Sequence, residues 1–214
     1  MKIAFFSTRS YDKQFFNRMN PDYGHEITYL DASLSPLTAS LARGHQAVCV
    51  FVNDRLDAET IEELSNVGVS AIALRCAGFN NVDLKAAAAR GITVVRVPAY
   101  SPHAVAEHAV ALILTLNRKT HKAYNRVRES NFALDGLVGF DLNQKVVGVI
   151  GMGKIGSVFA NIMLGFGCSV LAYDPLQETH LEQDALGRKI QFVDLPTLYS
   201  KADIISLHCP LTEQ

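Results

Sequence analysis

The sequence predicts an α/β fold built from two doubly wound parallel sheets. Short apolar runs rich in Val, Ile and Phe alternate with stretches of helical character along the 214 residues. This alternation is typical of β-α-β units, in which the strands are parallel and buried on both faces. The rhythm changes near residue 100, so we expect one unit over residues 1–100 and a second over residues 101–214.

The first unit is expected to contain five strands, each a run of apolar and β-branched residues. These are Lys2–Ser7, Glu26–Leu30, Ala47–Val52, Ala71–Arg75 and Thr93–Val97. Two of the intervening stretches, Ala58–Val67 and Val82–Arg90, have helical character. We expect Asn81 to cap the second of these helices, and Gly91 to end it in the left-handed conformation that glycine adopts readily.

The second unit is expected to begin with a helix that is longer than its neighbours. Ser101-Pro102 marks its start, because proline suits the first helical position, and apolar residues then recur at helical spacing through about Tyr124. A loop at Leu134–Gln144 follows. Four more strands are expected after it: Lys145–Ile150, Ser169–Tyr173, Ile190–Val193 and Ile204–Leu207.

The composition argues against several classes of protein. Hydrophobic residues make up 49% of the chain and charged residues 19%, and the net charge of −1 gives no electrostatic reason to expect nucleic acid or membrane as a partner. The four cysteines lack the paired spacing of a zinc site or a disulfide framework. The apolar run Ile3–Phe6 is far too short for a signal peptide or a membrane span, so we expect a cytoplasmic protein.

A dinucleotide site is predicted where a strand, a glycine-rich turn and a helix follow one another after Val146. Gly151 allows the tight turn, Gly153 lets the backbone approach a pyrophosphate, and Gly156 lets helix and strand pack closely. The pyrophosphate would bind the free N–H groups at the start of the helix near Lys154.

Asp174 ends the next predicted strand, about 18 residues after Gly156. A carboxylate in this place accepts hydrogen bonds from the adenosine ribose and repels a 2′-phosphate, so it favours NAD over NADP. The alternative is that Asp174-Pro175 simply starts a turn. The preceding strand and glycine-rich turn favour the dinucleotide interpretation.

Other segments also lie at the carboxyl ends of predicted strands, where open parallel sheets bind ligands. Arg75–Asn81 contains Gly78, around which backbone N–H groups can point at an anion. The alternative, a glycine turn followed by a helix cap, is compatible with that function. Val97–Pro102 contains Tyr100, at an expected cleft between the units, although a single tyrosine beside prolines is more often a packing residue.

The segment Ser206–Thr212 contains His208 and Cys209, residue types that serve as a base and a nucleophile. Adjacent residues of an extended strand point to opposite faces, so these two cannot easily act on one substrate atom. We therefore expect backbone contacts to the cofactor here. Glu107 and His108 also face different directions on their helix, which argues against an acid–base pair.

Together these segments resemble the D-isomer-specific 2-hydroxyacid dehydrogenases, and the resemblance covers the whole chain. The segments that carry it are Arg75–Asp83, Val97–Pro102, Val105–His108, the glycine turn with Lys154-Ile155, and Ser206–Thr212. Two of these, and Asn125–Gly139, look most like the D-lactate branch of the family. The resemblance implies a flavodoxin-like substrate domain over residues 1–100 and the N-terminal half of an NAD-binding Rossmann domain over residues 101–214.

The resemblance also implies a reaction, in which a hydride passes from NADH to the carbonyl carbon of a 2-oxo acid, pyruvate in the D-lactate branch. Gly78 and Phe79 match the loop that binds the substrate carboxylate, and Tyr100 matches an aromatic residue of the substrate pocket. The positions that match cofactor contacts, besides the glycines, are Val105, Lys154, Ile155, Asp174, Cys209 and Pro210.

The catalytic arginine, glutamate and histidine of the family lie further along its chains than Gln214. We therefore assign no catalytic residue and expect these 214 residues alone to be inactive. A homo-oligomer, dimer or tetramer, is expected. Two alternatives stay open: a module of the same superfamily that senses NAD without turnover, and a dehydrogenase for a larger 2-hydroxy acid. Neither Phe79 nor Tyr100 decides the size of the pocket.

Overall fold

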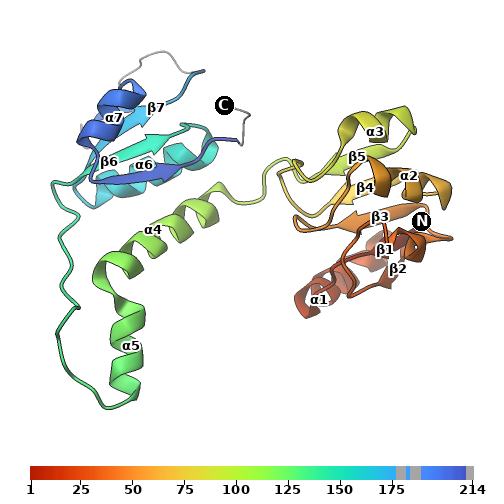
Figure 1. The fold of residues 1–214 in the computed structure, drawn as a ribbon, viewed down its shortest axis with the longest axis horizontal. Helices are drawn as coiled ribbons and strands as arrows, with labels where there is room; N and C mark the ends of the chain where they lie inside the picture. The colour runs from red at the N-terminus through yellow and green to blue at the C-terminus, as the bar shows by residue number, and fades with distance from the viewer. Residues whose placement is uncertain (177–181, 184–188, 211–214) are drawn as a thin grey trace. The chain divides into compact units, whose positions relative to one another are not determined.

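The computed structural model describes residues 1–176, 182–183 and 189–210 of the chain. The chain divides into two compact units, Met1–Tyr100 and Ser101–Gln214, and each contains one five-stranded sheet (Figure 1). The doubly wound α/β fold class predicted from the sequence is confirmed.

The sheet of the first unit is parallel throughout, with the strand order β2-β1-β3-β4-β5. This is the flavodoxin-like order that the resemblance implied. The strands are β1 (Lys2–Phe5), β2 (Glu26–Tyr29), β3 (Ala47–Val50), β4 (Ala71–Leu74) and β5 (Thr93–Arg96). The helices are α1 (Ser10–Met19), α2 (Ala58–Asn66) and α3 (Leu84–Ala89), with 3-10 turns at Asn20–Asp22 and Ala39–Ala42.

The start of α3 differs from the prediction that Asn81 caps it. Asp83 is the cap, and its carboxylate accepts a hydrogen bond from the N–H of Ala86 at 2.9 Å. The reason is a parallel bridge between Leu56 and Val82, which keeps the backbone extended two residues further than the local sequence suggested. The predicted end is confirmed, because Gly91 follows the helix with φ +67°.

The sheet of the second unit has the order β10-β6-β7-β9-β8. Its parallel part, β9-β7-β6-β10, has the order of the first four strands of a Rossmann domain. The strands are β6 (Val146–Ile150), β7 (Ser169–Tyr173), β8 (Glu182–Gln183), β9 (Lys189–Phe192) and β10 (Ile204–Leu207), and β8 is antiparallel to β9. The helices are α4 (Pro102–Arg118), α5 (Thr120–Arg128), α6 (Lys154–Gly165) and α7 (Leu195–Lys201).

The long helix that was predicted through Tyr124 is two helices. Lys119 adopts the left-handed conformation, φ 51°, and separates α4 from α5. Contacts with a distant segment surround this break: the side-chain amide of Asn117 exchanges hydrogen bonds with the backbone of Phe140, and the Lys119 ammonium donates to the carbonyl oxygen of Val138. Periodicity within the helix cannot reveal such contacts.

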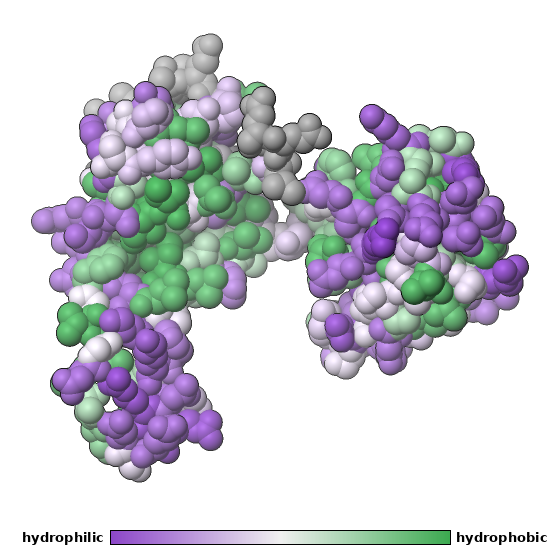
Figure 2. Space-filling view, in the orientation of Figure 1, coloured by the Kyte–Doolittle hydropathy of each residue, from purple (hydrophilic) through white to green (hydrophobic). Residues whose placement is uncertain are grey.

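The core of the second unit forms where α4 and α6 pack together against the sheet. Ala106 and Val110 of α4 are buried there with Phe159 and Met163 of α6. Figure 2 shows hydrophobic surface gathering over α4 and around α6, because part of the apolar side of α4, including Leu112, stays exposed. Among the described residues, no helix is both long enough and apolar enough to cross a membrane.

Candidate functional site

Two segments at the carboxyl ends of parallel strands contain most of the residues singled out from the sequence. We call residues Gly151–Gly156, between β6 and α6, the glycine turn. We call residues Arg75–Asn81, between β4 and α3, the amide loop. Within the described part of the chain, no group of three or more His, Cys, Asp or Glu residues is placed to hold a metal ion.

The glycine turn is shaped by close approaches between backbone atoms. Gly151 has φ +92°, and a Cβ atom there would lie 2.7 Å from the carbonyl group of His208. A Cβ atom on Gly156 would overlap the carbonyl oxygen of Gly151. Gly153 differs from both, because a Cβ there would meet no atom within 4 Å. Two glycines therefore close the turn, and the third faces open space.

The N-terminus of α6 has backbone donors available for a ligand. Its N-cap is Gly153, which offers no side-chain cap, whereas α2, α3, α4 and α7 are each capped by an Asp or Ser side chain. Among the hydrogen bonds of the described residues, none is donated by the backbone N–H of Gly153, Lys154 or Ile155. Donors left in this way, at the positive end of a helix, form a favourable site for an anion.

Asp174 holds the glycine turn from the end of β7. One carboxylate oxygen accepts the N–H of Met152 at 2.8 Å, and the other accepts the N–H of Leu176 at 2.9 Å. The bond to Leu176 closes a turn at Asp174-Pro175, which is what the alternative interpretation of these two residues predicted. Asp174 thus starts a turn and also fixes the backbone just before Gly153, while its contact with a ribose stays a prediction.

His208 lies beside the glycine turn, at the end of β10. Its N–H donates to the carbonyl oxygen of Ile150 at 2.8 Å, its Nε2 lies 2.9 Å from the Ser206 hydroxyl, and its ring packs 4.9 Å from the Phe159 ring. Burial lowers the pKa of this imidazole below its usual value. The adjacent Cys209 is exposed.

The ring of His208 packs against Phe159 of α6, while the backbone contacts to the cofactor expected for this segment stay a prediction. Cys209 and Pro210 continue the chain past His208 as exposed residues. Leu211 and Thr212, which complete the segment singled out from the sequence, lie outside the described residues.

The amide loop is anchored at its start by Arg75, whose side chain is only 9% exposed. The guanidinium donates to the carbonyl oxygens of Phe6, Ser7 and Cys49 at 3.1–3.3 Å. These bonds tie the carboxyl-terminal parts of β1 and β3 to the loop, and the guanidinium also faces the carboxylate of Asp12 in α1 at 3.7 Å. Burial raises the pKa of the Cys49 thiol to about 11, although the neighbouring guanidinium opposes this shift, so the thiol stays protonated at neutral pH.

The outer part of the amide loop also leaves backbone donors available. Within the described residues, the N–H groups of Ala77, Gly78 and Phe79 donate to no acceptor. Gly78 is exposed and a Cβ there would meet no atom within 4 Å, while Phe79 is 41% exposed. The Cys76 thiol, whose pKa is raised by burial, donates to the carbonyl oxygen of Gly78 at 3.2 Å.

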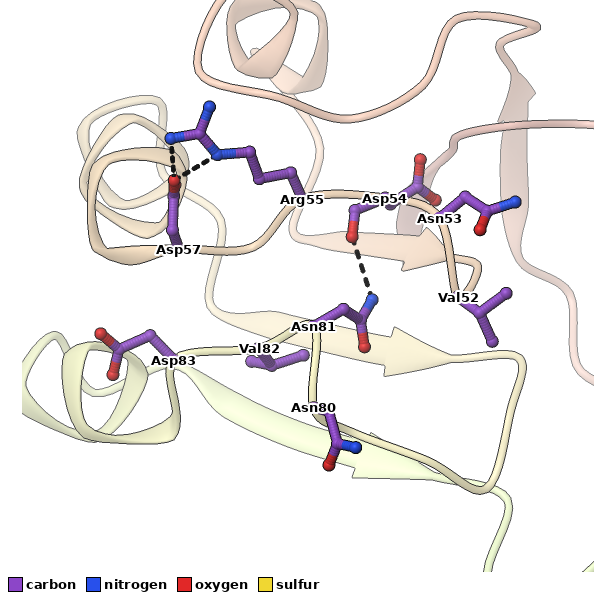
Figure 3. A pocket seen from close by; sticks show the side chains of 9 residues that line it. All are labelled: Val52, Asn53, Asp54, Arg55, Asp57, Asn80, Asn81, Val82 and Asp83. Atoms are coloured by element: carbon purple, nitrogen blue, oxygen red, sulfur yellow. Dashed lines mark hydrogen bonds and ion pairs between the residues drawn. The ribbon is translucent and has the colours of Figure 1, made fainter. Parts of the chain in front are cut away.

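A cavity of about 500 Å³ lies next to the amide loop (Figure 3). It opens between the loops that follow β3 and β4 and is lined by Val52, Asn53, Asp54, Arg55, Asp57, Asn80, Asn81, Val82 and Asp83. The side-chain amide of Asn81, the residue expected to be a cap, donates to the carbonyl oxygens of Phe51 and Asp54 and joins the two loops. Arg55 pairs with Asp57.

Sequence reasoning missed the segment after β3, although it also lies at the carboxyl end of a strand. Its central residue is Asp54, which is buried and accepts hydrogen bonds from the Ser7 hydroxyl at 2.6 Å and from the N–H groups of Phe51 and Leu34 at 2.6 and 2.8 Å. Asp54 and Arg55 follow closely after the apolar strand β3. Polar residues at this place in the sequence were the signal that could have identified the segment.

The remaining candidates lie where the sequence passes from one unit to the next. Tyr100, the last residue of the first unit, is 65% exposed. Ser101 caps α4 by accepting the N–H of Ala104 at 3.2 Å, which confirms the predicted helix start. Val105 is partly buried in the first turn of that helix.

Comparison with known proteins gives one consistent family. Residues 3–197 match the family described as D-isomer specific 2-hydroxyacid dehydrogenase, catalytic domain. The D-lactate dehydrogenase of Escherichia coli (strain K12) is 51% identical over 214 residues, which are 100% of this chain and 64% of that protein. The chain therefore spans slightly less than two thirds of the length of that relative.

Solved structures agree with the sequence match. The apo-structure of D-lactate dehydrogenase from Escherichia coli superposes with a TM-score of 0.87 at 51% identity, covering 100% of this chain and 66% of that one. A crystal structure of D-lactate dehydrogenase from Aquifex aeolicus, described as complexed with NAD and lactic acid, gives 0.80 at 32% identity over 99% of this chain and 61% of that one.

Proposed function

This chain belongs to the D-isomer specific 2-hydroxyacid dehydrogenase family, and on that premise we propose that its full-length protein is an NAD-dependent D-lactate dehydrogenase. The proposed reaction is pyruvate plus NADH to D-lactate plus NAD. The observation that carries the proposal is the pair of segments with unused backbone N–H groups, one in each unit. Each suits a different anion: a small carboxylate and a pyrophosphate.

The amide loop is proposed to bind the carboxylate of the 2-oxo acid. Gly78 and Phe79 are exposed, and their N–H groups could donate to a planar anion without first breaking a hydrogen bond within the described residues. The open space at Gly78 lets a ligand approach the backbone closely. Tyr100 is proposed to line the substrate pocket.

The glycine turn is proposed to bind NAD. The residues fit this cofactor: Gly153 leaves space for a pyrophosphate, and the N–H groups of Lys154 and Ile155 are donors for it. Asp174 is proposed to accept hydrogen bonds from the adenosine ribose. The other proposed contacts are Val105, Gly151, Gly156, Cys209 and Pro210. When bound, NADH supplies the hydride that the carbonyl carbon receives.

The described residues orient the two ligands and are not assigned the proton transfer. His208 packs on Phe159, and burial lowers its pKa, so its imidazole is mostly neutral at pH 7 and carries no imidazolium proton to donate. We assign the proton donor and the charged carboxylate anchor to the family's histidine and arginine beyond residue 214. General acid catalysis alone contributes about 10²–10⁴-fold, so a polypeptide of residues 1–214 should show no turnover.

The proposal is tested with the full-length protein by following NADH absorbance in the presence of pyruvate. We expect reduction to D-lactate, a strong preference for NADH over NADPH, and slower turnover of 2-oxo acids with larger side chains. The polypeptide of residues 1–214 is the matched control. Tight NADH binding without turnover of any 2-oxo acid would instead identify a protein that senses NAD.

A further inference from the structure

Arg96, the last residue of β5, touches the amide loop on both sides of Gly78. Its guanidinium donates to the carbonyl oxygen of Ala77 at 2.6 Å, and its Cζ lies 5.2 Å from the centre of the Phe79 ring. No carboxylate of the described residues forms an ion pair with it. Arg96 therefore brings a positive charge and two directional contacts to this loop.

The contact with Ala77 fixes the direction of a neighbouring donor. The carbonyl of Ala77 and the N–H of Gly78 belong to the same planar trans peptide and point in opposite directions. A guanidinium that holds the carbonyl therefore turns the N–H of Gly78 away from itself. It also polarises the peptide, which makes that N–H a better donor.

The next peptide plane is held by a different residue. The Cys76 thiol donates to the carbonyl of Gly78, which shares its peptide with the N–H of Phe79. The stacking of Arg96 on the Phe79 ring limits the rotation of the same stretch from outside. Both donors proposed for the carboxylate are thus oriented through the carbonyl on the other side of their peptide.

We infer that Arg96 is a positioning residue for the substrate carboxylate. It acts through the Ala77–Gly78 peptide and the Phe79 ring, and it takes no part in hydride or proton transfer. This role rests on the proposed function of the amide loop. Lysine would supply the charge and one hydrogen bond, but it lacks the planar group that can donate and stack at once.

The test compares R96M and R96K with the unmutated full-length protein. R90M is the matched control, because Arg90 lies in the same unit outside the amide loop. Its guanidinium donates to the Glu62 carboxylate at 2.7 Å. Function is measured as the KM and kcat for pyruvate and the Kd for NADH. Loop structure is measured as the rate of hydrogen exchange at the N–H groups of Val82 and Val97. Those two N–H groups bond the carbonyls of Phe79 and Cys76 and report whether the loop stays closed.

We expect R96M to raise the KM for pyruvate about ten-fold, as loss of a charged hydrogen bond typically does, with kcat and NADH affinity changed far less. Exchange at Val82 and Val97 should accelerate, R96K should fall between R96M and the unmutated protein, and R90M should change neither quantity.

Unchanged exchange and KM in R96M would overturn the inference. So would an R96K variant that matches the unmutated protein, because charge alone would then explain the effect. Faster exchange in R96M, in a protein that reduces no 2-oxo acid even when unmutated, would support the positioning of the loop and reject the proposed function.

Discussion

The amide loop and the glycine turn present the same kind of donor by opposite means. Both leave backbone N–H groups without acceptors among the described residues, at the carboxyl end of a parallel sheet. In the amide loop, the donors Arg96 and Cys76 hold carbonyl oxygens. In the glycine turn, the carboxylate of Asp174 accepts a hydrogen bond from the N–H of Met152. The rest of the turn is shaped by backbone contacts at Gly151.

This difference predicts which substitutions disturb each segment. A carbonyl held by a side chain sets the N–H on the far side of its peptide, so the amide loop depends on side chains and has space for a new Cβ. The glycine turn depends on the absence of Cβ atoms at Gly151 and Gly156, since backbone cannot move aside as a flexible side chain can. Substitutions that add a methyl group should therefore separate the two.

The largest expected effect is the loss of stability caused by Gly156→Ala. The new Cβ would overlap the carbonyl oxygen of Gly151, and overpacking against backbone costs about 1–3 kcal/mol or more. Gly78→Ala is the matched control, because its Cβ meets no atom within 4 Å and should change stability by less than about 0.5 kcal/mol. Urea unfolding of the full-length variants measures both. Equal unfolding midpoints would mean that the close approach at Gly156 is not a constraint.

A smaller effect is expected for Asp174→Ala, which removes the acceptor of two backbone N–H groups. The loss of a hydrogen bond typically costs about 0.5–1.5 kcal/mol, and NADH affinity should fall roughly ten-fold. Asp194→Ala is the control, since Asp194 caps α7 through the N–H of Thr197 and lies in the same unit. It should lose about 0.5–2 kcal/mol of stability without losing NADH affinity. Equal NADH affinities of the two variants would contradict the assignment of Asp174.

The smallest effect is a pH dependence that comes from His208 beside the glycine turn and has no counterpart at Gly78 of the amide loop. Because burial lowers the pKa of His208, the unfolded chain binds this proton more readily than the folded one. The stability from this group is complete above the unfolded pKa of about 6.5 and is lost as the pH falls below it. His208→Asn should reduce the slope of unfolding free energy between pH 5 and 7 by urea titration. Gly78→Ala should keep the full slope, and an unchanged slope in the His208 variant would reject this origin.

Much of the fold could be predicted because buried strands depend on local composition. Ser169–Tyr173 and Ile204–Leu207 coincide with the strands expected from their apolar runs. Features set by distant contacts could not be predicted in this way. The break at Lys119 accompanies hydrogen bonds to residues about twenty positions away, and the helix cap moved to Asp83 because Val82 pairs with Leu56.

The candidate site divides in the same manner. Gly151 and Gly156 could be placed from the sequence, because a backbone that close to another admits only glycine and leaves a recognisable spacing. Arg96 could not, since its partner Ala77 lies 19 residues earlier and no spacing marks the pair. Asp54 was missed for the same reason, because one of its hydrogen-bond partners is Ser7, 47 positions earlier in the sequence.

The most direct test of the account measures two ligands against two variants. A Cβ atom at Gly78 or Gly153 would meet no atom within 4 Å, and neither glycine has a positive φ, so the full-length variants Gly78→Val and Gly153→Ala should both fold. Gly78→Val should raise the KM for pyruvate about ten-fold and leave the Kd for NADH unchanged. Gly153→Ala should weaken NADH by a similar factor and leave the KM for pyruvate at saturating NADH unchanged. If each variant altered both constants, or neither did, the two segments would not be separate sites for the two anions.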